Sequence, residues 1–282
     1  MQRFDWQEMR EYWRTEHAGL AGLDLEGDPD GLNNVCHTGA PRWLNEYYAR
    51  YQTLVYRELL ARIPAKGPEA RALDVGCGAG RWCKLLADSG YEAEGLDLQT
   101  DLLELNRARY PHITFHDGAI QAFDPDRTFD LVSSVTVIAH NPFDQQMQVI
   151  QKLRALLETG GHAIILENVN DQAPHVFANS PERWRELFEA AGFRLRHQIA
   201  YDYSPAIRAI SAARSKLVPA RQETPAKPML AQVNGDGQNA IRRLRLMAQR
   251  VAVFVDDQVE GVLVRRQPTF RSVHAGFLFE AI

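Results

Sequence analysis

The feature of this sequence that most constrains its fold is a regular alternation of strand-like and helix-like segments between residues 69 and 203. Short apolar runs alternate with longer segments that end at glycine or proline. This alternation predicts a parallel, doubly wound sheet with right-handed crossovers, because parallel strands are joined through crossover helices. The predicted strands are residues 70–75, 92–97, 113–116, 129–135, 162–167 and 193–201, and the predicted helices are residues 81–89, 102–109, 145–157 and 181–191.

The composition fits one large domain in a reducing cytoplasm. The chain has 282 residues, of which 45% are hydrophobic and 24% charged, so it can bury a sizeable core and is not disordered throughout. Its net charge of -4 argues against nucleic acid as a partner for the whole chain. No apolar run approaches the ~18 residues of a transmembrane helix. Three cysteines without a C-x-x-C pair predict reduced thiols, and the preference for Arg over Lys suggests a bacterial source.

The two remaining parts of the chain break the alternation. Residues 1–68 are predicted as an N-terminal helical lid, with a helix that begins near Pro41. Residues 69–282 are predicted as the core, and a helical insertion at about 205–268 precedes a last strand at 273–279. The insertion is rich in Arg and Lys, which suits a phosphate-bearing substrate or an acidic membrane surface; the alternative is a solvated helix face.

The strongest local signal lies at the first predicted strand-to-helix turn, Leu73-Asp-Val-Gly-Cys-Gly-Ala-Gly80. Glycines at alternate positions let the main chain approach a ligand that a Cβ atom would exclude. Asp97 ends the second predicted strand, where a carboxylate can accept from two ribose hydroxyls, and Asp117 follows the third strand. Because ligands of open sheets lie outside the carboxyl ends of the strands, this set predicts a nucleoside site. The alternative is an ordinary tight turn with surface acids.

Two kinds of nucleoside ligand compete for such a site. A dinucleotide turn reads G-x-G-x-x-G and holds a pyrophosphate over the N-terminus of the next helix. Here the third glycine comes one residue early, and Asp74 stands beside the turn. An acid in that place repels pyrophosphate and suits a ligand that carries an ammonium group and a sulfonium. The pattern therefore favours S-adenosylmethionine over a nicotinamide dinucleotide.

Six segments of the chain resemble the class I S-adenosylmethionine-dependent methyltransferases. They are residues 73–80, 95–98, 116–119, 129–132, 156–162 and 187–193. The resemblance implies an α/β fold of the Rossmann-like methyltransferase type, in which a doubly wound sheet has seven strands. It also implies that the last strand, at residues 273–279, is antiparallel and inserted beside the fifth.

The same resemblance implies roles for individual residues. The backbone at Gly76 and Gly78 would pack against the methionine part of the cofactor, and Asp97 would hold the ribose. Asp117 would accept a hydrogen bond from the adenine amine. The other residues predicted to contact the cofactor are Asp74 and Arg81 at the turn, Leu98, Gly118 and Ala119 beside the adenine, and Val135 at the substrate boundary.

Methyl transfer needs an acceptor in line with the sulfonium, and a hydroxyl acceptor also needs a base. His140, after the fourth strand, is the leading candidate, and Glu167, at the end of the fifth, is the second. Each has an alternative: His140 can be structural or cofactor-facing, and Glu167 can be held by main-chain donors. No metal is predicted, because a divalent cation would need acidic ligands after the fourth and fifth strands. The residues after the fourth strand are His140-Asn141, which include no acid. Those after the fifth are Asn168-Val-Asn-Asp171, in which Asp171 is the one acid.

His37, Trp43 and Tyr47 are predicted to bind the substrate from the lid, with helix packing as the alternative for the aromatic residues. The sequence as a whole predicts a methyltransferase that acts on a hydroxyl of a small molecule or glycan. Nucleic-acid methylation and a catalytically silent cofactor-binding partner are the alternatives. An apolar stripe from Ile241 to Val262 further predicts a surface that a second copy could bury, giving a homodimer.

Overall fold

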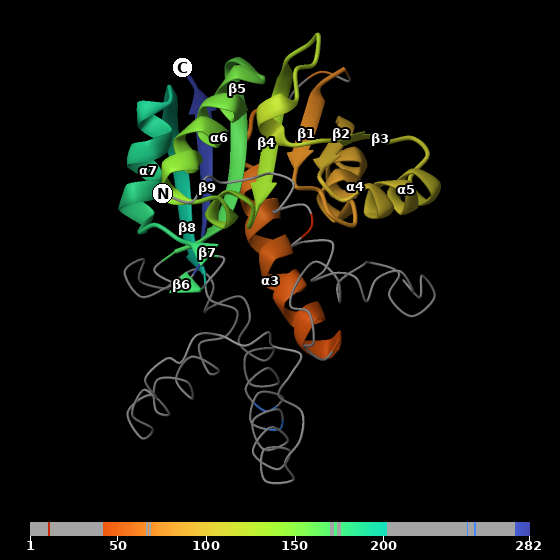
Figure 1. Ribbon diagram of the computed structural model, residues 1–282, viewed down its shortest axis with the longest axis horizontal. Coiled ribbons are helices and arrows are strands. Elements are labelled where there is room, and N and C mark those ends of the chain that lie inside the picture. The colour runs from red at the N-terminus through yellow and green to blue at the C-terminus, as the bar shows by residue number, and fades with distance from the viewer. Residues whose placement is uncertain are drawn as a thin grey trace. The chain divides into compact units, whose positions relative to one another are not determined.

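The predicted alternation of strands and helices is present in the computed structural model of the chain (Figure 1). The structure describes residues 42–169 apart from 66 and 68, then residues 172–173, 176–201 and 274–282, and the single residues Glu11, Met247 and Val251. His37 and nearly all of the predicted insertion lie outside the described residues. The chain divides into one unit of residues 1–201 and 268–282 and a second unit of residues 202–267. The predicted domain boundaries stay predictions.

Seven strands form one sheet in the order β3-β2-β1-β4-β5-β9-β8. The last strand of the chain, β9, runs antiparallel between β5 and β8, and the other neighbouring pairs are parallel. The predicted fold class and the predicted position of the last strand are therefore confirmed. The strands are β1 (Arg71–Val75), β2 (Glu92–Asp97), β3 (Thr114–Asp117), β4 (Phe129–Val135), β5 (Leu157–Asn168), β8 (Phe193–Tyr201) and β9 (His274–Ala281).

Helices cover both faces of this sheet (Figure 1). On one face, Phe188 of α7 stacks on Phe279 of β9 with ring centroids 4.3 Å apart. On the other face α3 lies so close to β9 that a Cβ atom at Gly276 would come within 2.7 Å of Val55. The helices are α3 (Arg42–Leu60), α4 (Arg81–Asp88), α5 (Thr100–Arg109), α6 (Phe143–Ala155) and α7 (Pro181–Ala190).

The boundaries follow local signals in most places. Ser180 caps α7, because its hydroxyl accepts a hydrogen bond from the amide of Arg183 at 3.2 Å, and Pro181 occupies the first helical position. One boundary was predicted wrongly. The Gly160-Gly161 pair lies inside β5 rather than after a helix, since the strand begins at Leu157 and continues through a register shift against β4.

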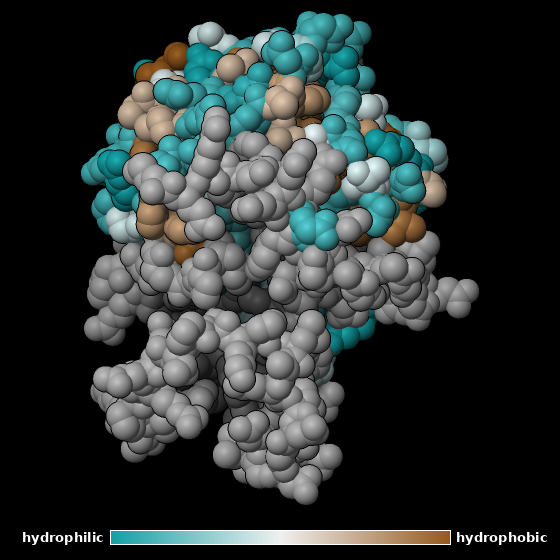
Figure 2. Space-filling model, in the orientation of Figure 1, coloured by the Kyte–Doolittle hydropathy of each residue, from teal (hydrophilic) through white to brown (hydrophobic). Residues whose placement is uncertain are grey.

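Two short features were not predicted. A two-stranded sheet pairs β6 (Gln172–Ala173) with β7 (Val176–Phe177), and a 3-10 turn, η3 (Ile138–His140), follows β4. None of the helices in the described ranges is long and apolar enough to cross a membrane. Polar residues cover most of the described surface in the view of Figure 2.

Candidate active site

The glycine turn joins β1 to α4 at the carboxyl edge of the sheet. Gly76, Gly78 and Gly80 all have left-handed backbone conformations, with φ of 73°, 48° and 74°. Gly76 also has no room for a side chain, because a Cβ atom there would lie 2.3 Å from a methyl group of Val137. Its amide donates to the carbonyl of Leu96 at 2.7 Å. The turn is therefore fixed against the end of β2 on one side and against the chain after β4 on the other.

Asp97 meets this turn directly. Its Oδ2 accepts a hydrogen bond from the amide of Gly78 at 2.8 Å, and its Oδ1 accepts from the amide of Gln99 at 2.9 Å. The side chain is half-buried, and burial raises the pKa of Asp97 above its ordinary value despite these amides. The structure thus brings together the turn and the acid that the sequence placed at the end of the second strand.

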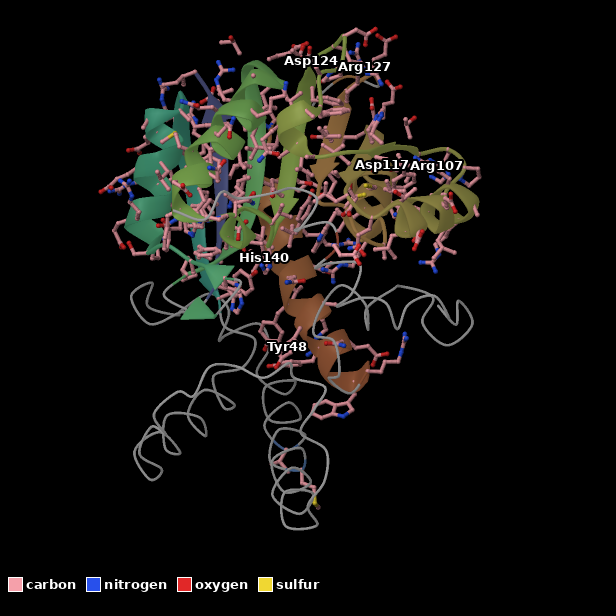
Figure 3. The ribbon with its side chains drawn as sticks, in the orientation of Figure 1. Tyr48, Arg107, Asp117, Asp124, Arg127 and His140 are labelled. Atoms are coloured by element: carbon pink, nitrogen blue, oxygen red, sulfur yellow. The ribbon has the colours of Figure 1, made fainter. Side chains whose placement is uncertain are left out.

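Asp117 lies beside Asp97 at the end of the neighbouring strand β3 (Figure 3). It is exposed and accepts a hydrogen bond from the hydroxyl of Thr100 at 2.7 Å. The amide of Gly118 donates to the carbonyl of Asp97 at 2.9 Å, and a Cβ atom at Gly118 would meet no atom of the described residues within 4 Å. Open space therefore borders this edge. Leu98 and Ala119, also predicted here, are half-buried.

Asp74 is enclosed rather than presented at the surface of the turn. It is 1% exposed, its Oδ1 accepts a hydrogen bond from the Ser133 hydroxyl at 2.5 Å, and Cys83 Sγ lies 4.0 Å from its Oδ2. Burial raises the pKa of Asp74 to about 7. This geometry places Asp74 among the groups that support the turn. The sequence argument, which had its charge facing the ligand, gave no sign of the Ser133 partner.

Arg81 connects the first turn of α4 with α3. Its Nη2 donates to Gln52 Oε1 at 2.6 Å, and its guanidinium carbon lies 4.2 Å from the centroid of the Trp82 ring. Trp82 in turn stacks on Tyr56, with ring centroids 4.4 Å apart. These contacts fix α3 beside the glycine turn, and the predicted contact of Arg81 with the cofactor stays a prediction.

The chain after β4 is shaped by Glu167. This residue is 0% exposed, and its carboxylate accepts hydrogen bonds from the amides of Val137 at 3.1 Å, Ile138 at 2.7 Å and Ala139 at 3.3 Å. Burial raises the pKa of Glu167 to about 7. The buried Glu167 carboxylate faces main-chain donors, which is the alternative that the sequence left open for it. It holds in place the turn that carries His140.

His140 ends that turn at the carboxyl edge of the sheet and is half-buried (Figure 3). The backbone before it is unusual, because Thr136 is the one non-glycine residue with positive φ, at 56°, in the described ranges. Val135, which precedes Thr136, is buried. The main chain therefore turns sharply between the last residue of β4 and the candidate base.

The two described residues among the predicted substrate contacts of the lid, Tyr47 and Trp43, differ in how far they are buried. Tyr47 is 4% exposed and packs within α3, with its ring centroid 4.9 Å from that of Tyr51. The guanidinium carbon of Arg50 lies 5.8 Å from the centroid of the Tyr47 ring. Packing, the alternative given for it, describes its surroundings. Trp43 is half-buried near the start of α3. No sequence signal pointed to Ser133, Gln52 or Tyr56, which reach this site from a buried strand and from α3.

A family model described as a methyltransferase domain matches residues 48–198, more than half of the chain. The chain therefore belongs to this family. This match confirms the predicted assignment to the class I S-adenosylmethionine-dependent methyltransferases. It also confirms S-adenosylmethionine as the cofactor.

Two relatives and one solved structure illustrate the range of similar proteins. Trans-aconitate 2-methyltransferase of Methylobacterium radiotolerans is 34% identical over 155 residues, 53% of this chain and 56% of the relative. Demethylmenaquinone methyltransferase of Lysinibacillus sphaericus is 30% identical over 114 residues, 38% of this chain and 48% of the relative. The chain thus spans about half the length of these curated relatives.

The solved structure is that of magnesium protoporphyrin IX methyltransferase from Synechocystis with bound SAH. It has a TM-score of 0.55 and 15% sequence identity, and the match covers 70% of this chain and 94% of that chain. At this identity the likeness supports the fold alone.

Proposed function

We propose that this protein transfers the methyl group of S-adenosylmethionine to a small organic acceptor, with a hydroxyl oxygen as the accepting atom. The observation that carries the proposal is the convergence of the Gly78 amide and the Asp97 carboxylate at the carboxyl edge of the sheet, 2.8 Å apart. In open sheets of this kind ligands lie at that edge.

The residues at this edge fit an adenosyl ligand. The Asp97 oxygens accept hydrogen bonds from the amides of Gly78 and Gln99 and, as carboxylate oxygens, could also accept from a ribose hydroxyl. Asp117 is exposed, and the space beside Gly118 is open, as an adenine edge requires. Leu98 and Ala119 would flank the base, and Gly76, Arg81 and Val135 would border the methionine part. When bound, the cofactor supplies a methyl group that its sulfonium has already activated.

We assign the proton transfer to His140. As the acceptor oxygen gains the methyl group, its proton passes to the imidazole, so the oxygen remains neutral after the new bond has formed. Glu167 is a positioning residue in this proposal, because it acts through the amides of Val137, Ile138 and Ala139 that carry His140. His37, Trp43 and Tyr47 stay proposed contacts of the acceptor.

The acceptor class rests on the names of the relatives. Trans-aconitate and demethylmenaquinone are both small molecules, and these names favour a small organic acceptor over a macromolecule. A saccharide hydroxyl stays within the proposal as the second acceptor class. The proposed location is the cytoplasm of a bacterium, and a homodimer is proposed through the apolar stripe in which the described residues Met247 and Val251 are exposed.

The first test measures cofactor binding by isothermal titration with S-adenosylmethionine. We expect Asp97→Asn to weaken binding at least tenfold, which corresponds to about 1.4 kcal/mol. Asp88→Asn is the matched control, because Asp88 forms a surface ion pair with Lys84 at the far end of α4. The control should stay within twofold of the wild type. A folded Asp97→Asn variant with unchanged affinity would overturn the assignment of the site.

The second test measures release of S-adenosylhomocysteine with a panel of hydroxy acids, phenols, saccharides and short RNA and DNA. Turnover with His140→Gln should fall at least a hundredfold on a hydroxyl acceptor, while cofactor affinity stays within threefold of the wild type. Turnover on RNA or DNA alone would favour a nucleic-acid methyltransferase. Cofactor binding without turnover across the panel would favour a silent partner.

A further inference from the structure

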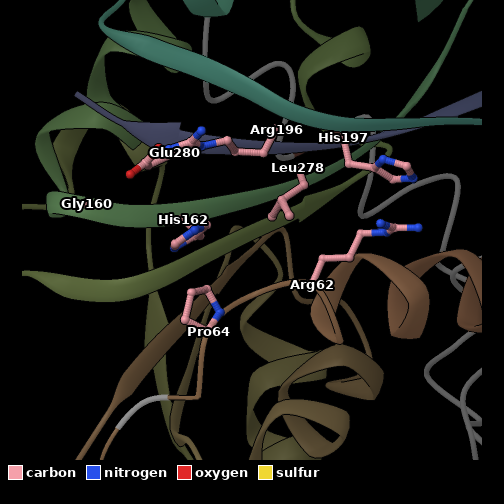
Figure 4. Close-up of a pocket in the computed structure, with 8 residues that line it drawn as sticks. All are labelled: Arg62, Pro64, Gly160, His162, Arg196, His197, Leu278 and Glu280. Atoms are coloured by element: carbon pink, nitrogen blue, oxygen red, sulfur yellow. Dashed lines mark hydrogen bonds and ion pairs between the residues drawn. The ribbon is translucent and has the colours of Figure 1, made fainter.

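A hollow lies away from the carboxyl edge, at the end of the sheet where β5 begins (Figure 4). Its volume is about 510 Å³, within the range of ~300–1,000 Å³ that small-molecule pockets occupy. It has no part in the proposed transfer of the methyl group. Its lining residues are Arg62, Pro64, Gly160, His162, Arg196, His197, Leu278 and Glu280.

The hollow exists because α3 is shorter than the sheet face that it covers. Side chains of a strand alternate between faces, so Gly276, Leu278 and Glu280 lie on one face of β9. Gly276 is pressed against Val55 and Leu59 of α3, but the helix ends at Leu60. Past that point, none of the helices in the described ranges lies over the same face. His162 lies opposite Glu280 in the sheet, and His197 lies opposite Leu278.

The uncovered face carries mainly nitrogen-bearing side chains. Two arginines and two histidines line the hollow against a single carboxylate, that of Glu280, which pairs with Arg196. Nη2 of Arg62 pairs with Oε1 of Glu58 at 3.1 Å, and both side chains are exposed. A guanidinium has five donors, so Arg62 keeps donors for a ligand.

The end of α3 does not cancel this positive charge. The carbonyl groups of the last helical turn repel an anion most strongly when they accept no hydrogen bond. Here the amides of Ala61, Arg62 and Ile63 donate to the carbonyl groups of Arg57, Leu59 and Leu60 at 2.9 to 3.1 Å. The main chain at this end is therefore satisfied locally.

The charge of Arg62 acts on His197 within the lining of the hollow. Its pKa is lowered, first by burial and then by the charge of Arg62, although Glu58 acts in the opposite direction. Figure 4 shows Arg62 and His197 on the same side of the hollow, with His162 and Pro64 further along it. A group beside a cation is easier to protonate once an anion lies between them.

We propose that this hollow binds a small oxyanion, a carboxylate or phosphate group, between Arg62, His162 and His197, with Arg196 as a further donor. Planar guanidinium groups match the geometry of both anions, and an imidazole N–H adds a directional donor. Gly160 leaves room in the lining, since a Cβ atom there would meet no atom of the described residues within 4 Å. The site lies on the opposite end of β5 from Asn168 and Glu167, so its ligand is distinct from the methyl acceptor.

The experiment follows the imidazole resonances of His197 by NMR while inorganic phosphate or citrate is added to the full chain at constant ionic strength. We expect a saturable shift and a higher pKa for His197 with at least one of the two anions, and neither effect with sodium chloride. Phosphate and citrate as separate arms distinguish a phosphate site from a carboxylate site.

Three variants make the test specific. Arg62→Gln should weaken the anion at least tenfold, whereas Arg57→Gln, an exposed residue of the same helix end outside the hollow, should change it less than twofold. Glu280→Gln removes the one lining carboxylate and should tighten binding at least threefold.

Equal responses to chloride, phosphate and citrate would overturn the site, and so would equal affinities of Arg62→Gln and Arg57→Gln. If Arg62→Gln fails to fold, the direction of change in Glu280→Gln decides, because a merely polar surface predicts no tightening. None of these measurements involves the cofactor, so their failure leaves the proposed methyl transfer untouched.

Discussion

Two carboxylates are buried in the same sheet but in opposite electrostatic surroundings. Glu94 of β2 is 1% exposed, and its two oxygens face His116 Nε2 at 2.6 Å and Arg127 Nη2 at 2.7 Å. Burial by itself would raise the pKa of Glu94, but these partners outweigh it and the pKa is lowered. Glu167 of β5 meets only main-chain amides, and its pKa is raised to about 7.

The difference shows what each region of the sheet is built to do. Hydrogen bonds from His116 and Arg127 and the charge of the Arg127 guanidinium keep Glu94 ionised, and this cluster ties β2 to β3 and to the loop that carries Arg127. Around Glu167 and Asp74, at the carboxyl edge, the partners are neutral amides, a hydroxyl and a thiol. Such partners orient the backbone through neutral donors, although the charge of Arg81 also acts on Asp74.

The largest expected effect is the loss of the Glu167 carboxylate. Glu167→Ala leaves the amides of Val137, Ile138 and Ala139 without their acceptor, and each such group costs about 1–3 kcal/mol when buried. We expect the free energy of unfolding in urea to fall by about 3 kcal/mol and turnover to fall with it. Glu167→Gln keeps one acceptor oxygen and should lose about 1 kcal/mol. A loss below about 1 kcal/mol for the alanine variant would contradict the anchoring role.

A smaller effect is expected when the cation of the other carboxylate is removed. Arg127→Ala leaves Glu94 with His116 alone, and breaking a buried pair costs ~3–5 kcal/mol. Arg127 is 38% exposed, so water replaces part of the interaction and we expect about 2 kcal/mol. Arg183→Ala is the control, because Arg183 and Glu186 form an exposed pair, worth less than about 1 kcal/mol. Equal effects of the two variants would show that burial of Glu94 does not matter.

The smallest effect is the pH dependence, which has opposite signs in the two regions. Between the ordinary value of 4.5 and about 7, folded Glu167 binds a proton that the unfolded chain releases, so stability falls as pH rises through this window. Glu94 stabilises the fold above its ordinary value, and that stability is lost as pH falls through its lowered pKa.

Urea unfolding between pH 3.5 and 7.5 measures both parts. Relative to the wild type, Glu167→Gln should flatten the change between pH 5 and 7 by on the order of 1 kcal/mol. Glu94→Gln should flatten only the change below pH 4.5. Parallel curves for the wild type and Glu167→Gln would mean that Glu167 does not titrate in this window.

Much of the fold followed from local patterns. Period-two and helical spacings located seven strands and their helices, and the glycine spacing located a turn whose three glycines have positive φ. The main error in the described core was to place Gly160-Gly161 after a helix. A glycine pair is typical of a helix end, but it can also lie inside a strand with an irregular register, as it does in β5. The meeting of Asp97 with the turn also followed, since both end neighbouring parallel strands.

The partners of the buried acids did not follow from local patterns. Ser133 lies 59 residues from Asp74, and Arg127 lies 33 residues from Glu94. The turn after β4 has Thr136 at positive φ and contains no glycine from which the turn could have been predicted. Sequence reasoning named main-chain donors as one alternative for Glu167, but it did not identify the amides of Val137, Ile138 and Ala139.

The sequence by itself determined the order of strands and helices, the chemistry of the turn and the two acids at the ends of β2 and β3. These depend on the spacing of neighbouring residues, which a single chain displays openly. Only the tertiary structure decided which carboxylates are enclosed, which of them meet cations and where α3 stops short of the sheet. Such contacts depend on strand register and helix length in three dimensions, because residues far apart in sequence then replace water as the surroundings of a buried group.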